Sequence, residues 1–185
     1  MDAQKFWFAG LAVVLSMFSV GSVNGQTQQG ELQTVSHVDL DRYIGTWYEF
    51  AKIPNWFQKK CARNTTATYA PKDDGRIKVI NRCYQADGSP EEAEGTARIV
   101  DTTTNAKLEV SFVRILGIQL FWGDYWIIGL DADYRYAVVG TPSRKYGWIL
   151  SRTRTLSPND ERDAFEILKS KGYNPDDFVK TDQTE

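Results

Sequence analysis

The sequence predicts an all-β fold, an eight-stranded antiparallel up-and-down β-barrel with one C-terminal α-helix packed against its outside. Eight short segments rich in β-branched and aromatic residues follow one another, and turn-forming clusters such as Asp87–Pro90 separate them. One segment after the last predicted strand has the length and periodicity of a helix. A closed barrel of eight strands is wide enough inside for one small ligand. A sandwich with a filled core has the same strand pattern and stays open as the alternative.

The first 25 residues are typical of a secretory signal peptide. Residues 1–5 are a short polar start, residues 6–20 form an almost unbroken apolar run, and small residues precede Gly25. An uncleaved membrane anchor is the alternative, but the run is shorter than the roughly 20 residues that span a bilayer. No cysteine lies near the cleavage point, so we expect no lipid anchor. The mature protein is then expected to be secreted or periplasmic.

The remaining chain has the size of one domain. We expect a lead segment at 26–38, a barrel domain at 39–178 and a loose polar tail at 179–185. With 42% hydrophobic residues, a formal charge of −2 and no basic cluster, the composition gives no indication of nucleic-acid binding. The sequence does not determine the oligomeric state.

Alternation of apolar and polar residues identifies the strands and the side chains that face inward. Leu108, Val110 and Phe112 share one face of their strand, and Ala97 lies on the apolar face of the strand before it. These four are candidates for the ligand cavity. Tyr84, Tyr125 and Trp126 are further candidates, but one β-bulge would reverse their facing. The predicted strands are GTWYEFAK (45–52), RNTTATYA (63–70), RIKVINRCY (76–84), EEAEGTARIVD (91–101), AKLEVSFV (106–113), DYWIIGLD (124–131), YRYAVVG (134–140) and YGWILSR (146–152).

The two cysteines of the chain, Cys61 and Cys83, flank a hairpin turn at 71–76. In an oxidising compartment such a pair is expected to form a structural disulfide between paired strands. The alternative is a reactive thiolate, for which Lys59, Lys60 and Arg63 provide nearby positive charge.

The predicted helix runs from about Pro158 to Lys171. Ser157 is a suitable N-cap, Pro158 suits the first helical position, and Gly172 follows the end. Ala164, Phe165 and Leu168 form an apolar stripe at helical spacing. This stripe is expected to cover the later strands, which are apolar on both faces.

Three blocks of sequence resemble those of the lipocalin family, especially its bacterial outer-membrane and apolipoprotein D-like members. They are GTWYE at 45–49, LDADYRYAVV at 130–139 and WILSRT at 148–153, and the wider resemblance extends from about 39 to 178. It implies a closed barrel in which Trp47 plugs one end, Arg152 lies against its indole, and Gly45 lets the chain pass close beneath. The family usually has Thr-Asp-Tyr where this chain has Ala132-Asp133-Tyr134, so the turn there is expected to differ.

If one end of the barrel is plugged, ligands must enter at the other end. The loops expected there contain many apolar residues and a few lysines and arginines. The loop at 114–123 also contains Ile115, Ile118 and Leu120; we expect it to tuck into the barrel mouth, with a surface that dips into a membrane as the alternative. The function expected from this, and implied by the resemblance, is a non-catalytic carrier of fatty acids or lysophospholipids. The entrance candidates are Trp56, Phe57, Lys59, Lys60, Arg114, Leu116, Phe121 and Trp122.

Two other function classes are compatible with a barrel of this kind. A lipid-modifying enzyme of the same fold would need a free cysteine as its nucleophile, because the one histidine, His37, precedes the barrel. Glu49, Glu92 and Glu94 have no evident partner in the sequence. A haem or tetrapyrrole site would need an axial histidine or cysteine at the mouth. We therefore expect no catalytic residue, no metal and no cofactor.

Overall fold

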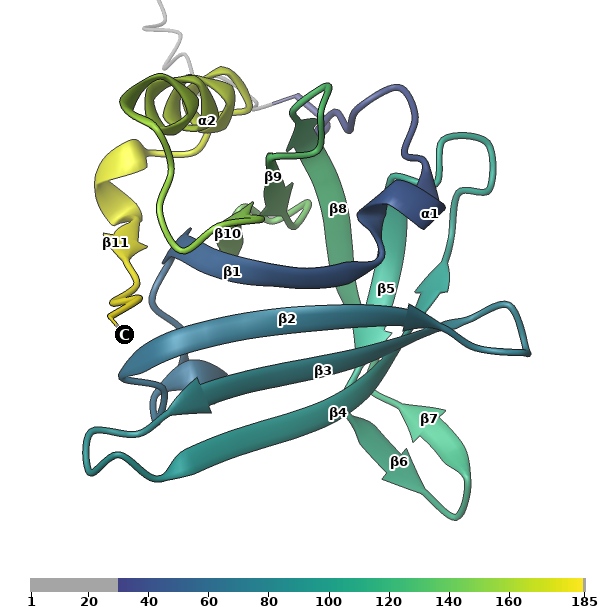
Figure 1. Cartoon of the computed structure of the whole chain (residues 1–185). Helices are drawn as coiled ribbons and strands as arrows, with labels where there is room; N and C mark the ends of the chain where they lie inside the picture. Colours follow the sequence, from purple (N-terminus) through teal and green to yellow (C-terminus); the bar gives the residue numbers. More distant parts are fainter. Residues whose placement is uncertain (1–29, 185) are drawn as a thin grey trace, which may run out of the picture.

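The computed structural model describes residues 30–184, so the predicted signal peptide lies outside the described residues. Pairing of β10 with β1 closes the sheet, and the sandwich alternative is therefore wrong. The expected eight-stranded antiparallel barrel is confirmed (Figure 1). Its strands are β1 (Gly45–Lys52), β2 (Arg63–Pro71), β3 (Ile77–Tyr84), β4 (Pro90–Ile99), β5 (Lys107–Ser111), β8 (Gly123–Leu130), β9 (Tyr136–Gly140) and β10 (Gly147–Ser151).

Two clusters of buried side chains lie on opposite faces of the barrel wall. The interior cluster lies inside the barrel, and its buried members are Val38, Tyr43, Trp47, Tyr69, Ile77, Val79, Ala97, Ala106, Leu108, Ile127, Tyr134, Ala137, Val139 and Leu150. The outer cluster lies beneath the C-terminal helix and contains Leu32, Phe50, Ala51, Ile128, Tyr136, Val138, Ile149, Ala164, Leu168 and Tyr173. Strands β8, β9 and β10 contribute to both clusters, which explains why they are apolar on both faces.

The predicted helix is confirmed as α2 (Pro158–Ser170). The hydroxyl of Ser157 accepts the amide hydrogen of Asp160 at 3.2 Å, and Gly172 ends the helix with φ +80°. Helix and sheet approach closely at Gly129, where an added Cβ would lie 2.6 Å from Ile167 Cγ2. Among residues 30–184, no helix combines the length and the apolar character that crossing a bilayer requires.

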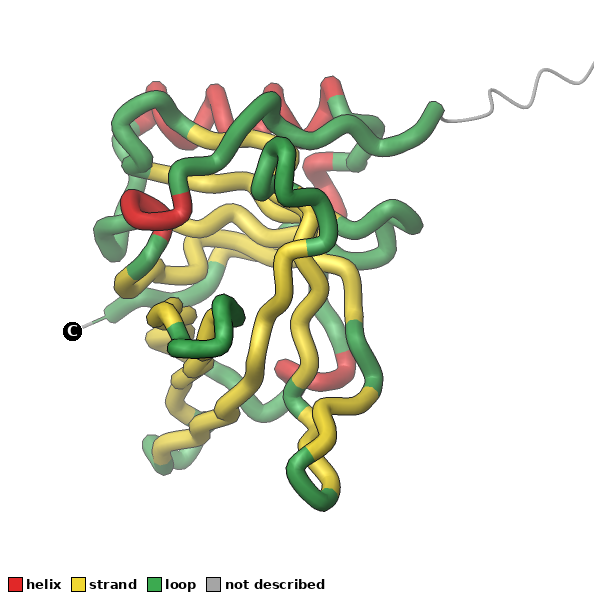
Figure 2. The backbone as a smooth tube through the Cα atoms, turned by 90° about the vertical axis from the view of Figure 1, so that its right-hand side faces the viewer, coloured by secondary structure: helices red, strands yellow, loops and turns green. Residues whose placement is uncertain are grey.

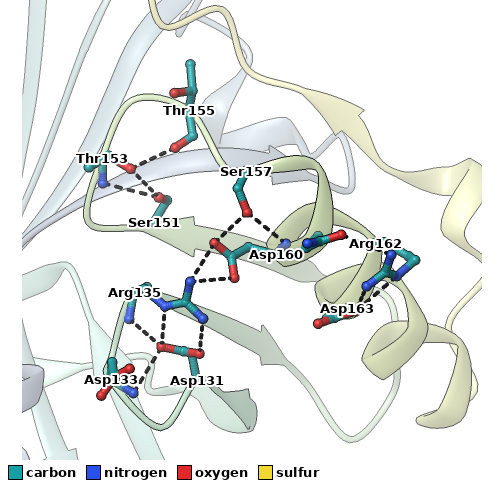
Figure 3. A network of polar contacts seen from close by, with 11 residues as sticks. Asp131, Asp133, Arg135, Ser151, Thr153, Thr155, Ser157, Asp160, Arg162 and Asp163 are labelled. Carbon is teal, nitrogen blue, oxygen red and sulfur yellow. Dashed lines mark hydrogen bonds and ion pairs between the residues drawn. The ribbon is translucent and has the colours of Figure 1, made fainter.

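An ion-pair network attaches the turn after β8 to the start of α2 (Figure 3). The guanidinium of Arg135 lies 2.8 Å from Asp131 and 2.9 Å from Asp160. Hydrogen bonds from Arg135 hold the pKa of Asp131 below its usual value. The Asp131 carboxylate also accepts the amide hydrogen of Asp133 at 3.0 Å. This carboxylate therefore organises the turn in which Ala132 replaces the family's threonine.

The loop expected to tuck into the barrel mouth instead forms a separate hairpin of β6 (Val113–Ile115) and β7 (Ile118–Leu120). It projects beyond the barrel on the side of the molecule away from α2 (Figures 1 and 2). Leu116 at its tip is 97% exposed, so the tucked conformation was wrong. Three short helices were not predicted: α1 (Leu40–Tyr43), η1 (Trp56–Gln58) and η2 (Pro175–Asp177).

The C-terminal segment is part of the barrel wall, and the expectation of a loose tail is wrong for residues 179–184. Strand β11 (Val179–Lys180) pairs with the second half of β1. The amide of Asn64 donates to Asp182 O at 2.7 Å, and Gln183 Nε2 donates to the carbonyls of Glu49 and Thr65. Since β2 pairs with β1 only up to Tyr48, the tail satisfies backbone groups that the separation of the two strands leaves free.

Candidate ligand-binding barrel

Trp47 and Arg152 lie together at the closed end of the barrel. The Trp47 side chain is fully buried, and its Nε1 donates to Tyr43 O at 2.8 Å. The guanidinium carbon of Arg152 lies 3.8 Å from the centre of the indole ring. Gly45 has φ +101°, and a Cβ there would lie 3.3 Å from Arg152 Nη1. A side chain at this position would therefore strain the backbone and crowd the guanidinium.

Arg152 also binds the backbone around the start of β1. Its guanidinium donates to three carbonyl oxygens, those of Thr46 at 3.0 Å, Ile44 at 3.1 Å and Arg42. Burial lowers the pKa of Arg152. The guanidinium nevertheless stays charged, because arginine is not deprotonated in proteins. The carbonyls of the segment that enters the barrel thus receive charge-assisted hydrogen bonds.

Three phenol groups meet inside the barrel, next to Trp47. The hydroxyl of Tyr125 lies 2.9 Å from that of Tyr43 and 2.8 Å from that of Tyr69. The ring centres of Tyr43 and Trp47 are 4.9 Å apart. Burial raises the pKa of Tyr43 and Tyr125 well above the usual value and that of Tyr69 to about 12. The phenols therefore remain protonated, and two mutual hydrogen bonds use two of their three protons. One O–H donor is left for an acceptor outside this phenol cluster.

The structure places most of the cavity candidates on the inner face. Ala97 and Leu108 belong to the interior cluster, and Val110 and Tyr125 pack against it. Phe112 lies at the rim, where its ring occupies the space that a Cβ on Gly95 would need, and it is 43% exposed. Contact of these residues with a ligand stays a prediction.

Two cavity candidates, Tyr84 and Trp126, lie on the outer face, so their assignment was wrong. Trp126 packs against the outer cluster, and the ammonium of Lys107 lies 4.3 Å from its ring centre. Tyr84 follows the buried Cys83 and lines an outer groove of about 730 Å³ together with Arg82 and others. Successive residues of a strand alternate between its two faces, and each assignment had the wrong parity.

The mouth contains a buried ion pair that the sequence did not reveal. Glu49 is 3% exposed, and its carboxylate lies 2.8 Å from the ammonium of Lys52. The carboxylate also accepts hydrogen bonds of 2.6 Å from Gln58 Nε2 and Thr181 Oγ1. Glu49, expected to lack a partner, thus joins β1 to η1 and to the C-terminal segment. The signal that could have identified it is its place two residues after Trp47, on the same inward-facing side of a strand.

The entrance candidates occupy three different environments. In η1, the ring of Phe57 lies 5.4 Å from Tyr146 and 6.4 Å from Trp148, so this helix folds against aromatic side chains at the mouth. Trp56 is 74% exposed beside it. Trp122 lies beneath the guanidinium of Arg98, with 4.2 Å between them. The exposed entrance candidates also include Lys59, Lys60, Arg114, Leu116 and Phe121.

The predicted disulfide between Cys61 and Cys83 is confirmed. Their Cα atoms are 5.4 Å apart, and it joins the end of β3 to the segment just before β2. Cys61 therefore precedes its strand by two residues instead of lying on it. The bridge fixes the loop that contains η1 to the barrel wall.

Comparison with known proteins assigns the family. The family model described as "Lipocalin-like domain" matches residues 38–183. The chain belongs to the lipocalin family. Outer membrane lipoprotein Blc of Escherichia coli K12 is 35% identical over 174 residues, which cover 94% of this lipocalin and 95% of that protein. Apolipoprotein D of Macaca fascicularis is 36% identical, covering 78% and 77% of the two chains. The resemblance to bacterial and apolipoprotein D-like members is thereby confirmed.

Similar proteins include one from a plant, and the fold matches that of a solved insect protein. Temperature-induced lipocalin-1 of Arabidopsis thaliana is 37% identical over 162 residues, covering 86% of this chain and 87% of that one. Insecticyanin of the tobacco hornworm Manduca sexta matches with a TM-score of 0.66 at 25% identity, covering 84% of this chain and 86% of that chain. The chain thus belongs to a family that binds small hydrophobic ligands.

Proposed function

We propose that this lipocalin is an extracytoplasmic, non-catalytic carrier of single amphiphilic lipids, either fatty acids or lysophospholipids. The observation that supports it best is the barrel itself, which is closed by Trp47 and Arg152 at one end and lined by apolar side chains above them. Each methylene of a tail buried there contributes about 0.8 kcal/mol. The cations Lys59, Lys60 and Arg114 at the mouth suit an anionic head group.

The phenol cluster affects which part of a ligand can lie at the closed end of the barrel. Its spare O–H donor meets no acceptor if only an alkyl end approaches, and an unpaired buried donor is costly. A ligand that places an oxygen atom there satisfies the donor. The cluster therefore favours ligands with a polar atom at the deep end or tails too short to reach Tyr125.

The enzymatic alternative has lost the group on which it depended. Both cysteines of the chain are joined in the disulfide, so neither provides a nucleophilic thiolate. Within residues 30–184, no three histidine, cysteine or carboxylate side chains gather in a way that would hold a metal ion. The disulfide therefore favours a binding function.

The proposed compartment rests on the N-terminal sequence and on the relatives. One relative is named an outer membrane lipoprotein. In this chain both cysteines are committed to the disulfide, so we propose secretion or release into a periplasm without a lipid attached to cysteine. The disulfide itself fits an oxidising compartment.

Native mass spectrometry tests the carrier function directly. Protein purified from its own compartment is measured, stripped of lipid, and titrated with a long-chain fatty acid and with a lysophospholipid. We expect a one-to-one adduct and saturable quenching of tryptophan fluorescence. Val110→Phe, which adds volume on the inner face, should weaken binding about tenfold or more, and the outward-facing control Glu109→Gln should leave it unchanged. A folded protein that refuses both lipids, or equal effects of the two substitutions, contradicts the proposal.

A further inference from the structure

The β6–β7 hairpin presents apolar side chains to solvent at the mouth end of the barrel. The exposed fraction is 97% for Leu116, 79% for Phe121, 64% for Ile118 and 53% for Ile115. Soluble monomeric proteins rarely expose contiguous apolar surface of this kind without a partner for it. The connections β1–β2 and β5–β8 both leave the barrel at its mouth, so the exposed Trp56 lies at the same end of the molecule.

The turn of this hairpin contains a residue that the turn itself disfavours. Leu116 and Gly117 have φ values of +49° and +84°. Two-residue hairpin turns with both φ values positive favour Asn-Gly or Asp-Gly, because a short polar side chain tolerates the left-handed conformation. Leucine has no such advantage, and here it is almost fully exposed to water. The stability of the isolated protein in water therefore does not explain why this position is a leucine.

The base of the hairpin is fixed to the barrel, so the tip is held away from it. Gln119 Nε2 donates to Ser111 O at 2.8 Å, and the hydroxyl of Ser111 contacts Leu120 O. Phe112, the residue just before β6, packs into the space beside Gly95. The apolar tip is therefore presented by a braced element, and it does not collapse onto the barrel.

The charged residues within the two apolar mouth loops, 53–62 and 113–122, are all positive. Arg114 is the one charged residue from 113 to 122, and Lys59 and Lys60 follow η1, whose segment 53–62 contains no carboxylate. The ammonium of Lys60 forms an ion pair with the carboxylate of Glu91 at 3.6 Å. The side chains of Lys59 and Arg114 are exposed. Apolar side chains flanked by exposed cations are the combination that binds the interface of anionic membranes.

We propose that the β6–β7 hairpin, together with Trp56, inserts into the interface of a membrane that contains anionic lipids and holds the barrel mouth against it. Insertion transfers Leu116, Ile118 and Phe121 from water to the acyl boundary, which supplies the apolar contact that the fold does not. The inference goes beyond the carrier function, since docking needs no ligand in the barrel.

Vesicle co-sedimentation of lipid-stripped protein tests the proposal. Vesicles of phosphatidylcholine are compared with vesicles that also contain phosphatidylglycerol. Leu116→Asn creates the favoured Asn-Gly turn, so its thermal midpoint should equal or exceed that of the parent, yet its partition coefficient should fall about tenfold. The matched control is Val100→Asn, because Val100 is 56% exposed at the opposite end of the barrel, and its partitioning should not change.

Four results would overturn the proposal or a part of it. Leu116→Asn could partition as strongly as the parent, or Val100→Asn could lose as much binding as Leu116→Asn, and in either case the hairpin is not the docking element. Equal binding to both kinds of vesicle refutes the part played by the cations. A dimer seen by sedimentation velocity without lipid, abolished by Leu116→Asn and accompanied by no vesicle binding, assigns the hairpin to self-association instead.

Discussion

Replacing Arg152 by methionine should be the most damaging single change at the closed end of the barrel. The substitution keeps an apolar stem but removes the charge above the indole of Trp47, which contributes about 0.5–2 kcal/mol. It also removes three hydrogen bonds to backbone carbonyls, at about 1 kcal/mol each. The free energy of unfolding should therefore fall by about 3–5 kcal/mol. The carbonyls affected are those of Arg42, Ile44 and Thr46.

The neighbouring Arg154 provides a matched control. Its guanidinium donates to Asn64 Oδ1 at 3.2 Å and to Thr184 O at 3.3 Å, and it lies 5.4 Å from the ring of Tyr48. These longer, exposed contacts predict a loss of about 1 kcal/mol or less for Arg154→Met. Equilibrium unfolding in urea, followed by circular dichroism, measures both variants with the same change of side chain.

Ligand affinity separates this structural role from a binding role. Arg152 lies on the side of Trp47 that contacts the entering backbone, so a ligand above the phenol cluster should not reach it. The dissociation constant of Arg152→Met should therefore match that of the parent under conditions where both are folded. The reasoning is refuted if the two arginine variants unfold at the same urea concentration, or if Arg152→Met loses affinity while keeping parental stability.

Three further results are expected. Tyr125→Phe removes the hydroxyl that joins the phenol cluster, so titration calorimetry should show weaker binding only for ligands with an oxygen atom at the deep end; an equal loss for every ligand would contradict this orientation. Asp131→Asn should destabilise the protein at neutral pH. Because Arg135 depresses the Asp131 pKa in the folded state, the parent loses this stability as the pH falls through that depressed value, so the two melting curves should converge in acid. The double change Cys61→Ser and Cys83→Ser should cost about 3 kcal/mol for a closure spanning 22 residues, measured by urea unfolding, and no loss would show that the bridge does not constrain the unfolded chain.

The barrel was predictable because its signals are local and repeated. Alternation of apolar and polar residues predicts which face of β5 points inward. The capping residues around Pro158 predict where α2 begins. Trp47 and Arg152, far apart in sequence, were paired only through the resemblance to a family. Strand periodicity by itself gives no information about which distant residues meet.

The misassigned residues show where periodicity fails. The sequence does not show the register of β8, so the prediction that Trp126 points inward had no firm basis. The structure places Tyr125 and Ile127 inside the barrel and Trp126 outside. In β1, a bulge between Glu49 and Ala51 shifts the register against β10. Lys52 consequently pairs with the inward-packing Trp148 and reaches Glu49. Bulges depend on pairing between strands, which one strand's sequence does not encode.

The phenol cluster and the C-terminal segment could not have been found in a single sequence. The three tyrosines come from α1, β2 and β8, and each alone is typical of an ordinary strand or helix residue. Strand β11 contains only two residues, and its polar continuation has the composition of a loose terminus. Its order comes from carbonyl and amide groups that β1 and β2 leave unpaired where they separate.

Stability and proposed function lie at opposite ends of this molecule. At the closed end, Arg152 satisfies carbonyls and the phenol cluster is almost fully hydrogen-bonded. At the mouth, Leu116 and Phe121 combine positive φ values with large exposed apolar surfaces, which are unfavourable in water. Substitutions that make the hairpin more favourable in water should therefore stabilise the isolated protein while weakening its attachment to lipid. A gain in stability without any loss of lipid binding at these two positions would argue that the exposed hairpin has no function.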